Sequence, residues 1–433
     1  MQRQYWQFYW PLTLTGLAVL LAKQFQNGAL ARYPDAVREL AIFAIATSTF
    51  FVCNAAILFI PQMANVLARS RRANRVCLRF TVVSCVVLST FLALLSFSPP
   101  GRMLLAAVFD IEGSKLNSVM AYLRLLTPLI VINALRQYYT GLLVQGHRTA
   151  TVTIMNAVYL ASTVAVLVVG FQAGWSVVTT LALSLLAPAA LHLVFSFAAY
   201  HLGDHRPDRF GEDDLSYREV FAFFWPVAVT SVMFALSRPI LYSFVSRRPD
   251  SDATIAVLRV AFDFTLIFQN PMNQFRHLFV TFGGQDAHGV RRFMIRVMMA
   301  ITAVMLLVAA TPISTSVLRD LLGVGDELLA RAGEVVWVMC LIPLVVTARN
   351  YYHGLSLVRR RTRSMAAGGI GRVLAIYAAA WALYHLGWLN HAWAAVVLVL
   401  GFVIETAVVV LSMHLWPHEV AGGDEPVLVA PDP

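Results

Sequence analysis

Charged residues are scarce in this chain: they make up 13% of its 433 residues, whereas soluble domains carry about 25%. Apolar runs long enough to span a bilayer recur from the first residues to the last fifty, so a soluble domain is excluded. Because backbone groups in lipid must bond internally, and because the runs do not alternate, they predict helices and exclude barrel strands. We therefore expect an all-α polytopic membrane protein.

Lysine and cysteine are also rare. Lys23 and Lys115 are the only lysines, and the other 31 of the 33 basic residues are arginine. The net charge of +10 sits mostly in short loops, which is typical of positive-inside topology and argues against a nucleic-acid partner. The four cysteines lie in apolar runs without metal-ligand spacing, so we expect packed thiols.

No enzyme motif is present. The glycine-rich segment 368–371 lacks a P-loop lysine and a preceding strand, and it predicts close helix packing instead. We expect no enzyme activity, no cofactor and no metal site. A monomer in the bilayer is the expected state.

Twelve apolar segments are predicted to span the membrane. Their approximate ranges are 8–30, 37–67, 76–98, 119–145, 151–172, 175–202, 218–246, 253–282, 292–312, 328–357, 365–386 and 389–414. Arginines gather in every second connection, at Arg69, Arg71, Arg72, Arg75, Arg148, Arg206, Arg209, Arg291, Arg292, Arg359, Arg360, Arg361 and Arg363. This asymmetry predicts that both termini are cytoplasmic. Arginine-heavy usage favours a bacterial inner (plasma) membrane.

The chain is an internal duplication. Arg136-Gln137-Tyr138-Tyr139-Thr140-Gly141 returns 213 positions later as Arg349-Asn350-Tyr351-Tyr352-His353-Gly354. Phe8-Tyr9-Trp10-Pro11 returns 215 positions later as Phe223-Phe224-Trp225-Pro226. We therefore predict two pseudo-symmetric six-helix lobes, residues 1–202 and 218–416, joined by a cytoplasmic linker at 203–217 and followed by a disordered tail at 417–433. Six spans per lobe make the repeats parallel, with a substrate site between them.

The repeat places cations at matched depths. The shift of 215 carries Lys23 onto Arg238, and each has a polar residue four positions on, Asn27 or Tyr242. A charge within a span costs roughly 2.5–3.5 kcal/mol, so matched pairs suggest an aqueous cavity and an anionic ligand. The alternative is that each cation snorkels to the headgroups.

A second pair, Arg136 and Arg349, lies toward the cytoplasmic ends of spans 4 and 10. Arginine forks suit carboxylate and phosphate oxygens, although hydrogen bonding between helices of one half is the alternative. Span 8 is polar on one side, which holds Asn270 and Asn273 and has Arg276 beside it, and this pattern predicts a lining helix. In the same span Arg259 and Asp263, four apart, are expected to pair with each other.

Glu405 is the one acid clearly in the middle of a span. It can balance an arginine or carry a coupling proton. Because cations outnumber acids within the spans, the counter-charge role is favoured.

At these residues the chain resembles the progressive ankylosis protein family, a branch of the multidrug/oligosaccharidyl-lipid/polysaccharide flippase superfamily. The matching motifs are Phe224-Trp225-Pro226, Ser237-Arg238-Pro239-Ile240, Phe244-Val245-Ser246-Arg247, Phe275-Arg276, Val346-Thr347-Ala348-Arg349 with Gly354, Arg372, and Gly401-Phe402-Val403-Ile404-Glu405. Gln24 and Asn27 fit as well, but animal members have an acidic residue where this chain has Lys23. The resemblance implies a twelve-helix, two-lobed fold and export of small polyanions, with pyrophosphate, citrate and nucleoside triphosphate as candidates.

These observations predict an exporter of a small multivalent anion that works by alternating access. The predicted substrate-binding residues are Lys23, Gln24, Asn27, Arg136, Arg238, Tyr242, Asn270, Asn273, Arg276 and Arg349. Two alternatives stay open: a flippase for an anionic lipid-linked headgroup, which needs an opening between spans 1 and 8, and cation-coupled drug extrusion, which needs a carboxylate in the cavity.

Overall fold

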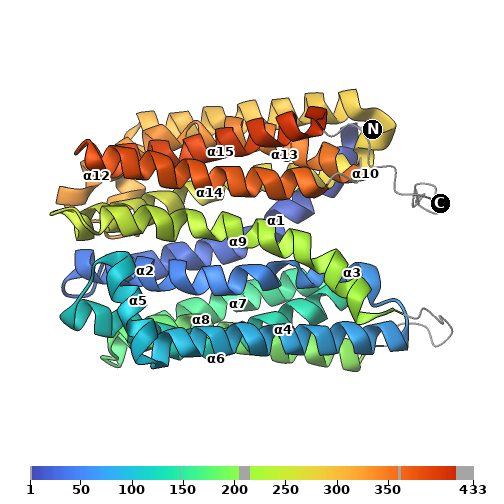
Figure 1. The fold of residues 1–433 in the computed structure, drawn as a ribbon, viewed down its shortest axis with the longest axis horizontal. Helices are drawn as coiled ribbons and strands as arrows, with labels where there is room; N and C mark the ends of the chain where they lie inside the picture. The colour runs from blue at the N-terminus through green and yellow to red at the C-terminus, as the bar shows by residue number, and fades with distance from the viewer. Residues whose placement is uncertain (1, 147, 204–214, 359–361, 416–433) are drawn as a thin grey trace.

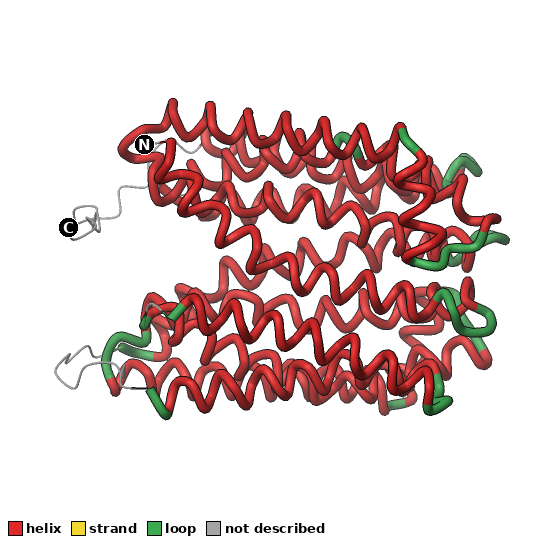
Figure 2. The backbone as a smooth tube through the Cα atoms, turned by 180° about the vertical axis from the view of Figure 1, so that it is seen from behind, coloured by secondary structure: helices red, strands yellow, loops and turns green. Residues whose placement is uncertain are grey.

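The computed structural model describes residues 2–146, 148–203, 215–358 and 362–415, and this part of the chain contains helices and no strand (Figures 1 and 2). The helices are α1 (Gln2–Leu30), α2 (Ala36–Ala55), the 3₁₀ turn η1 (Ala56–Phe59), α3 (Ile60–Leu67), α4 (Arg71–Phe97), α5 (Pro99–Phe109), α6 (Gly113–Gln145), α7 (Thr149–Gln172), α8 (Val177–His201), α9 (Tyr217–Val245), α10 (Ser251–Ala310), α11 (Pro312–Ser316), the π-helical turn η2 (Val317–Leu321), α12 (Asp326–Met339), α13 (Ile342–Val358), α14 (Thr362–His385) and α15 (His391–Leu415). The predicted all-α fold is confirmed. Most of the predicted linker and the tail lie in 204–214 and 416–433, outside the described residues.

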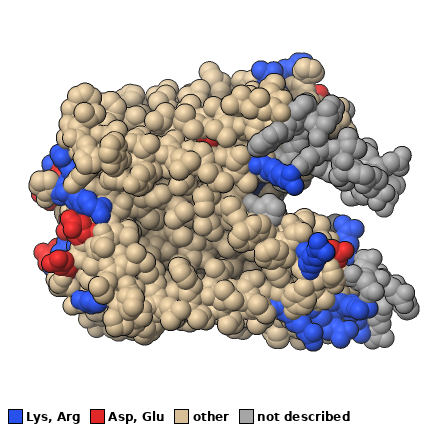
Figure 3. Space-filling view, in the orientation of Figure 1, with Lys and Arg blue, Asp and Glu red and all other residues tan. Residues whose placement is uncertain are grey.

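Ten helical segments of the described chain are long and apolar enough to cross a membrane. The charged side chains in Figure 3 gather at the two ends of the molecule, and nearly all of the surface between the ends is uncharged. All twelve predicted segments are helical, but α1 is not among the ten, and segments 253–282 and 292–312 share the single helix α10. Twelve crossings and cytoplasmic termini therefore stay predictions.

The 60-residue helix α10 is bent at Asp286, its one non-helical residue. The Asp286 carboxylate accepts a hydrogen bond from the backbone N–H of Gly289 at 2.8 Å, which is how a cap residue satisfies the first turn of a helix. Tyr5 of α1 donates its hydroxyl to the same carboxylate at 2.9 Å. The bend is thus fixed by side chains, and it separates the two predicted segments.

Two bundles make up the molecule. In Figure 1, α2 to α8 form the lower bundle, α10 and α12 to α15 form the upper bundle, and α1 and α9 run between them. We call α1–α8 the first half and α9–α15 the second half. α1 begins, and α15 ends, at the same end of the molecule, on the right of Figure 1.

The repeated aromatic motif anchors the two crossing helices. Tyr9 of α1 stacks on Phe275 of α10 in the other half, with ring centroids 5.5 Å apart. Phe224, the residue that matches Tyr9 in the repeat, meets Phe80 of α4 in the first half at 5.2 Å. Each half therefore sends the start of its first helix onto the other half, and the sequence duplication is also a duplication of packing.

Candidate functional site

A cavity of about 390 Å³ lies between the two halves. Helices α1, α2, α7 and α8 line it from the first half, and α9, α10 and α12 to α15 line it from the second. Figure 3 shows the surface notched between the halves at the end where α1 begins. Most of the lining side chains are apolar, and the charged ones are Lys23, Arg238, Arg259, Asp263 and Arg372. The described part of the chain thus places four basic groups and one acid in the cavity lining.

Lys23 and Arg238 reach this cavity from the matched helices α1 and α9. Lys23 lies near Asp263, Arg238 and Arg259 but makes no hydrogen bond or ion pair with a described residue. The Arg238 side chain is 31% exposed, and its guanidinium stands over the ring of Phe262. The structure therefore brings together the two cations that the repeat matched.

Asp263 contacts two of the cations that line the cavity, Arg238 and Arg259. Its carboxylate accepts a hydrogen bond from Arg238 NH1 at 3.1 Å and lies 3.9 Å from Arg259 NH2, which confirms the predicted pairing within α10. Asn27 donates its amide to the same carboxylate at 3.3 Å. Gln24 donates to the Asp263 carbonyl oxygen at 2.6 Å. A buried acid of the second half is thus tied to α1 through two polar side chains.

Arg259 also links the two halves at this site. Its Nε donates to Asn27 Oδ1 at 2.8 Å, and its NH1 donates to the Thr47 hydroxyl of α2 at 2.9 Å. Its guanidinium also covers the Phe43 ring at 4.3 Å, a cation–π contact. Arg259 was not among the predicted substrate-binding residues. In the sequence, Arg259 is distinguished only by its position four residues before Asp263, and that spacing predicts a local pair.

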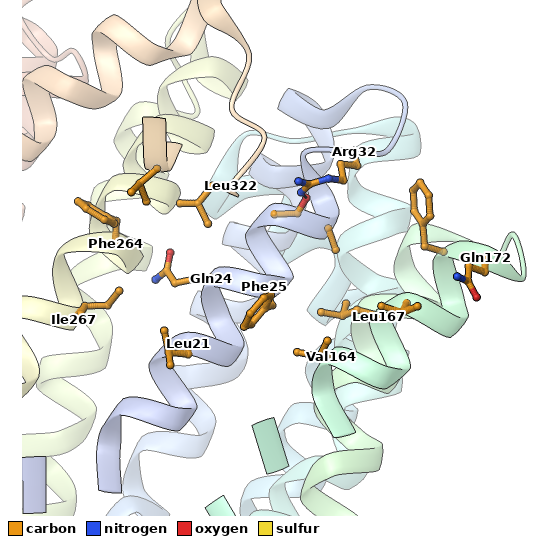
Figure 4. Close-up of a pocket in the computed structure, with 15 residues that line it drawn as sticks. Leu21, Gln24, Phe25, Arg32, Val164, Leu167, Gln172, Phe264, Ile267 and Leu322 are labelled. Carbon is orange, nitrogen blue, oxygen red and sulfur yellow. Dashed lines mark hydrogen bonds between the residues drawn. The ribbon is translucent and has the colours of Figure 1, made fainter. Parts of the chain in front are cut away.

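The other predicted residues are divided between the cavity and its surroundings. Tyr242 and Asn273 line the cavity. Asn270 is not part of the lining; its amide donates to the carbonyl of Thr13 at 3.0 Å and ties α10 to α1. Gln24 lines a different pocket on the far side of α1 (Figure 4).

Arg136 lies outside the cavity lining. It hydrogen-bonds with His192 Nδ1 at 3.2 Å, and its guanidinium stands over the ring of Tyr159, which does line the cavity. These contacts are of the kind expected from the alternative interpretation, bonding within one half. Arg136 is therefore half-buried beside a residue that lines the cavity, without lining the cavity itself.

Arg349 joins a cluster within the second half. Its Nε lies 2.8 Å from Glu405 Oε1, and Arg372 donates NH1 to Glu405 Oε2 at 3.2 Å. His353 Nε2 is 3.5 Å from the same carboxylate. Arg276 lies close enough to interact electrostatically with both Arg349 and Glu405. Because Glu405 sits between two arginines, the geometry supports the counter-charge role.

Close helix packing makes this cluster possible. A Cβ on Gly368 of α14 would come within 3.0 Å of the Glu405 carbonyl oxygen of α15, so the two helices touch backbone to backbone there. Arg372 leaves α14 one turn later and stacks on Phe402 at 3.9 Å. The glycine-rich segment thus packs as predicted. Arg372 lines the cavity, and the pattern of charged residues alone did not single it out.

No group of three or more His, Cys, Asp or Glu side chains in the described ranges could hold a metal ion. The cavity chemistry is that of arginine, lysine and amide donors. Such donors match the oxygens of carboxylates and phosphates.

The family model of the progressive ankylosis protein (ANKH) matches residues 2–264. The resemblance drawn from sequence motifs relied mainly on the second half, and several of those motifs lie beyond residue 264. The match therefore extends the family relationship over the whole first half, including Lys23, and into α10.

Solved structures share the fold. An inward-facing multidrug resistance MATE family transporter of the MOP superfamily is 12% identical with a TM-score of 0.69, covering 93% of this chain and 94% of that chain. The lipid II flippase MurJ, in an inward closed conformation, is 13% identical with a TM-score of 0.67, covering 93% and 87%. A MOP superfamily transporter from Pyrococcus furiosus, described as having a binding pocket of reverse polarity, is 13% identical with a TM-score of 0.55, covering 94% and 93%. At these identities the likeness concerns the fold alone.

Proposed function

The chain belongs to the progressive ankylosis protein (ANKH) family, and we propose that it exports a small multivalent anion through the cavity between its halves. It is a membrane transporter with the fold of the MOP superfamily. Citrate, other di- or tricarboxylates, pyrophosphate and nucleotides are the substrate candidates. We also propose that the protein works by alternating access, as a monomer and without a bound cofactor.

The observation that best supports anion export is the uncompensated positive charge of the cavity. Lys23, Arg238 and Arg259 share one acid, Asp263, while Arg372 is already paired with Glu405. Charges inside the membrane are expensive unless paired, so this excess indicates a ligand of opposite sign. A cavity of about 390 Å³ suits a small anion.

The membrane potential favours export of such a ligand. With the inside negative by 100 mV, each negative charge that leaves gains about 2.3 kcal/mol, so a trianion gains about 7 kcal/mol. Coupling to a proton or sodium gradient is then unnecessary. We propose a uniporter-like mechanism in which the cavity opens first to one side and then to the other.

Efflux from loaded vesicles tests this function. Wild-type protein in vesicles filled with citrate or pyrophosphate should release the anion when an inside-negative potential is applied. Lys23→Ala and Arg238→Ala should abolish the release. Arg319→Ala is a matched control, because Arg319 is an exposed cation that pairs with Asp326 outside the cavity. Unchanged efflux in both cavity variants would remove these residues from the site.

A second candidate function, flipping of an anionic lipid-linked headgroup, is favoured by one observation. The apolar pocket of Figure 4 lies between α1, α7 and α10, and Gln24, Phe25 and Leu167 are among the residues that line it. This is the kind of groove that an acyl chain needs, next to the helix that carries Lys23. If Val164→Trp and Leu167→Trp block transport of a lipid-linked substrate yet leave citrate and pyrophosphate efflux at wild-type rates, both functions are separable.

Cation-coupled drug extrusion ranks third. It needs a carboxylate that is free to bind a cation, and both acids of the central region, Asp263 and Glu405, are already shared between arginines. Freeing either acid would leave buried positive charge without compensation. A bacterial inner membrane as the location stays a prediction.

A further inference from the structure

We propose that Asp263 is a built-in competitor anion, which the transported anion must displace from Arg238, and that this competition makes the cavity select multivalent over monovalent anions. The inference rests on the proposed anion transport and names the residue that would set its specificity. Asp263 was not among the predicted site residues.

The Asp263 carboxylate is bound at both of its oxygens. Its two oxygens serve different partners: Oδ1 accepts from Arg238 NH1 at 3.1 Å, whereas Oδ2 accepts from Asn27 at 3.3 Å and faces Arg259 at 3.9 Å. The Arg238 contact can therefore be broken at one oxygen while the other oxygen keeps its partners. The carboxylate stays anchored when Arg238 leaves.

Arg238 is the partner of Asp263 that a ligand in the cavity can reach more easily. The side chain of Arg238 is 31% exposed, while that of Arg259 is 6% exposed and is fixed by Asn27, Thr47 and the Phe43 ring. The Arg238–Asp263 contact is thus the one that opens onto the cavity.

The Glu405 cluster gives a contrast within the same chain. There a carboxylate is also shared by two arginines, but their side chains are only 9% and 4% exposed, for Arg349 and Arg372. Neither contact offers a ligand an exposed arginine comparable to Arg238. Asp263 therefore stands out among the two shared acids as the exchangeable one.

Positive charge exceeds negative charge around Asp263. Lys23, Arg238 and Arg259 against Asp263 leave two positive charges in this part of the cavity, and Lys23 has no ion-pair partner among the described residues. A tethered carboxylate acts at a high effective concentration, so a monovalent anion gains little by replacing it. An anion with two or three charges can take over Arg238 and bind Lys23 at the same time. Valence therefore decides the competition.

The displacement also touches the contacts between the halves. Asp263 and Arg259 belong to α10, while Asn27 and Thr47, which bind them, belong to α1 and α2. Loss of the Arg238 contact changes the charge balance of this inter-half network. Substrate binding is thereby linked to the arrangement of the two halves, as alternating access requires.

Asp263→Asn tests the inference in the full-length protein. The readout is the ratio of the half-inhibitory concentrations of acetate and citrate, each competing with radiolabelled pyrophosphate for binding. With Asp263→Asn we expect tighter pyrophosphate binding and a fall of about tenfold in the acetate-to-citrate ratio, because acetate no longer faces a competitor. Asp263→Glu keeps the charge and should keep the wild-type preference. Weaker binding or an unchanged ratio in folded Asp263→Asn would overturn the inference.

A second measurement needs no variant. A structure of the wild-type protein with pyrophosphate bound should show the anion on Arg238 and Lys23, with Asp263 beyond hydrogen-bond distance of Arg238. An anion bound elsewhere, or an Arg238–Asp263 contact that persists beside it, would contradict the competition. If wild-type protein binds no anion at all, the proposed function fails; if it binds but Asp263→Asn keeps the ratio, only this inference fails.

Discussion

Arg349 of α13 lies 2.8 Å from Glu405 of α15, and both side chains are almost completely buried. Arg372 of α14 completes the contact from the third helix of the group. A residue predicted to bind substrate is therefore engaged by an acid of its own half. The arrangement joins three helices around one carboxylate.

Glu405→Gln should lower the stability of the folded protein. Its effect on anion binding should be the smaller of the two. Removing the acid leaves two buried arginines uncompensated, which costs about 3 kcal/mol. We expect a clearly lower melting temperature in detergent. Glu327→Gln, the same change at an exposed position of α12, is the control and should melt like wild type. Equal melting temperatures for the two variants would show that Glu405 is not the counter-charge of this cluster.

Arg136→Ala should weaken anion binding less than Arg238→Ala does. Arg136 hydrogen-bonds with His192 and is not among the residues that line the cavity, whereas Arg238 lines the cavity and is 31% exposed. We expect a change of less than about threefold for Arg136→Ala and of about tenfold or more for Arg238→Ala, measured as dissociation constants. The reverse order would mean that Arg136, not Arg238, meets the substrate.

The glycines that end the repeated motif should differ in their tolerance of a methyl group. A Cβ on Gly141 would lie 2.4 Å from the backbone oxygen of Pro61, while one on Gly354 would lie 2.9 Å from the Cβ of Phe279. Overpacking costs roughly 1–3 kcal/mol, and the closer backbone contact has less room to relax. Gly141→Ala should therefore lower the melting temperature more than Gly354→Ala. A larger loss for Gly354→Ala would contradict this ranking.

Tyr9→Ala and Phe224→Ala should cost similar stability. Each removes the ring that fixes a crossing helix to the opposite half, a loss of about 3 kcal/mol for a buried aromatic side chain. The neighbouring Trp225 is 55% exposed, so Trp225→Ala is the control and should have a small effect on thermal unfolding. An effect confined to one of the two rings would argue that the halves do not share this packing.

Much of the fold could be predicted from the sequence, because the apolar segments and the internal repeat are visible in the chain itself. The match of Lys23 with Arg238 follows from the repeat alone, and both line the cavity. The bend of α10 could not be predicted in this form. The bend depends on Asp286 and on Tyr5 of another helix. Because a pattern along the chain does not show such a contact, the two segments appear in the sequence as separate spans.

The roles of Arg136 and Arg349 show where prediction from sequence ends. The repeat gives both residues the same depth and the same face, yet one meets a histidine and the other a glutamate. A sequence pattern fixes depth along a helix but not which side chain of a distant helix will lie opposite. For the same reason the pair of Arg259 and Asp263 could be predicted as a local contact, while its ties to Asn27 and Thr47 could not.

The most direct measurement is calorimetric titration of purified wild-type, Lys23→Ala, Arg238→Ala and Arg319→Ala proteins with citrate and pyrophosphate. We expect wild-type and Arg319→Ala proteins to bind at least one of these anions with equal affinity, and each cavity variant to lose about tenfold or more. Wild-type affinity in both Lys23→Ala and Arg238→Ala would contradict the claim that cations from the two halves form one anion site.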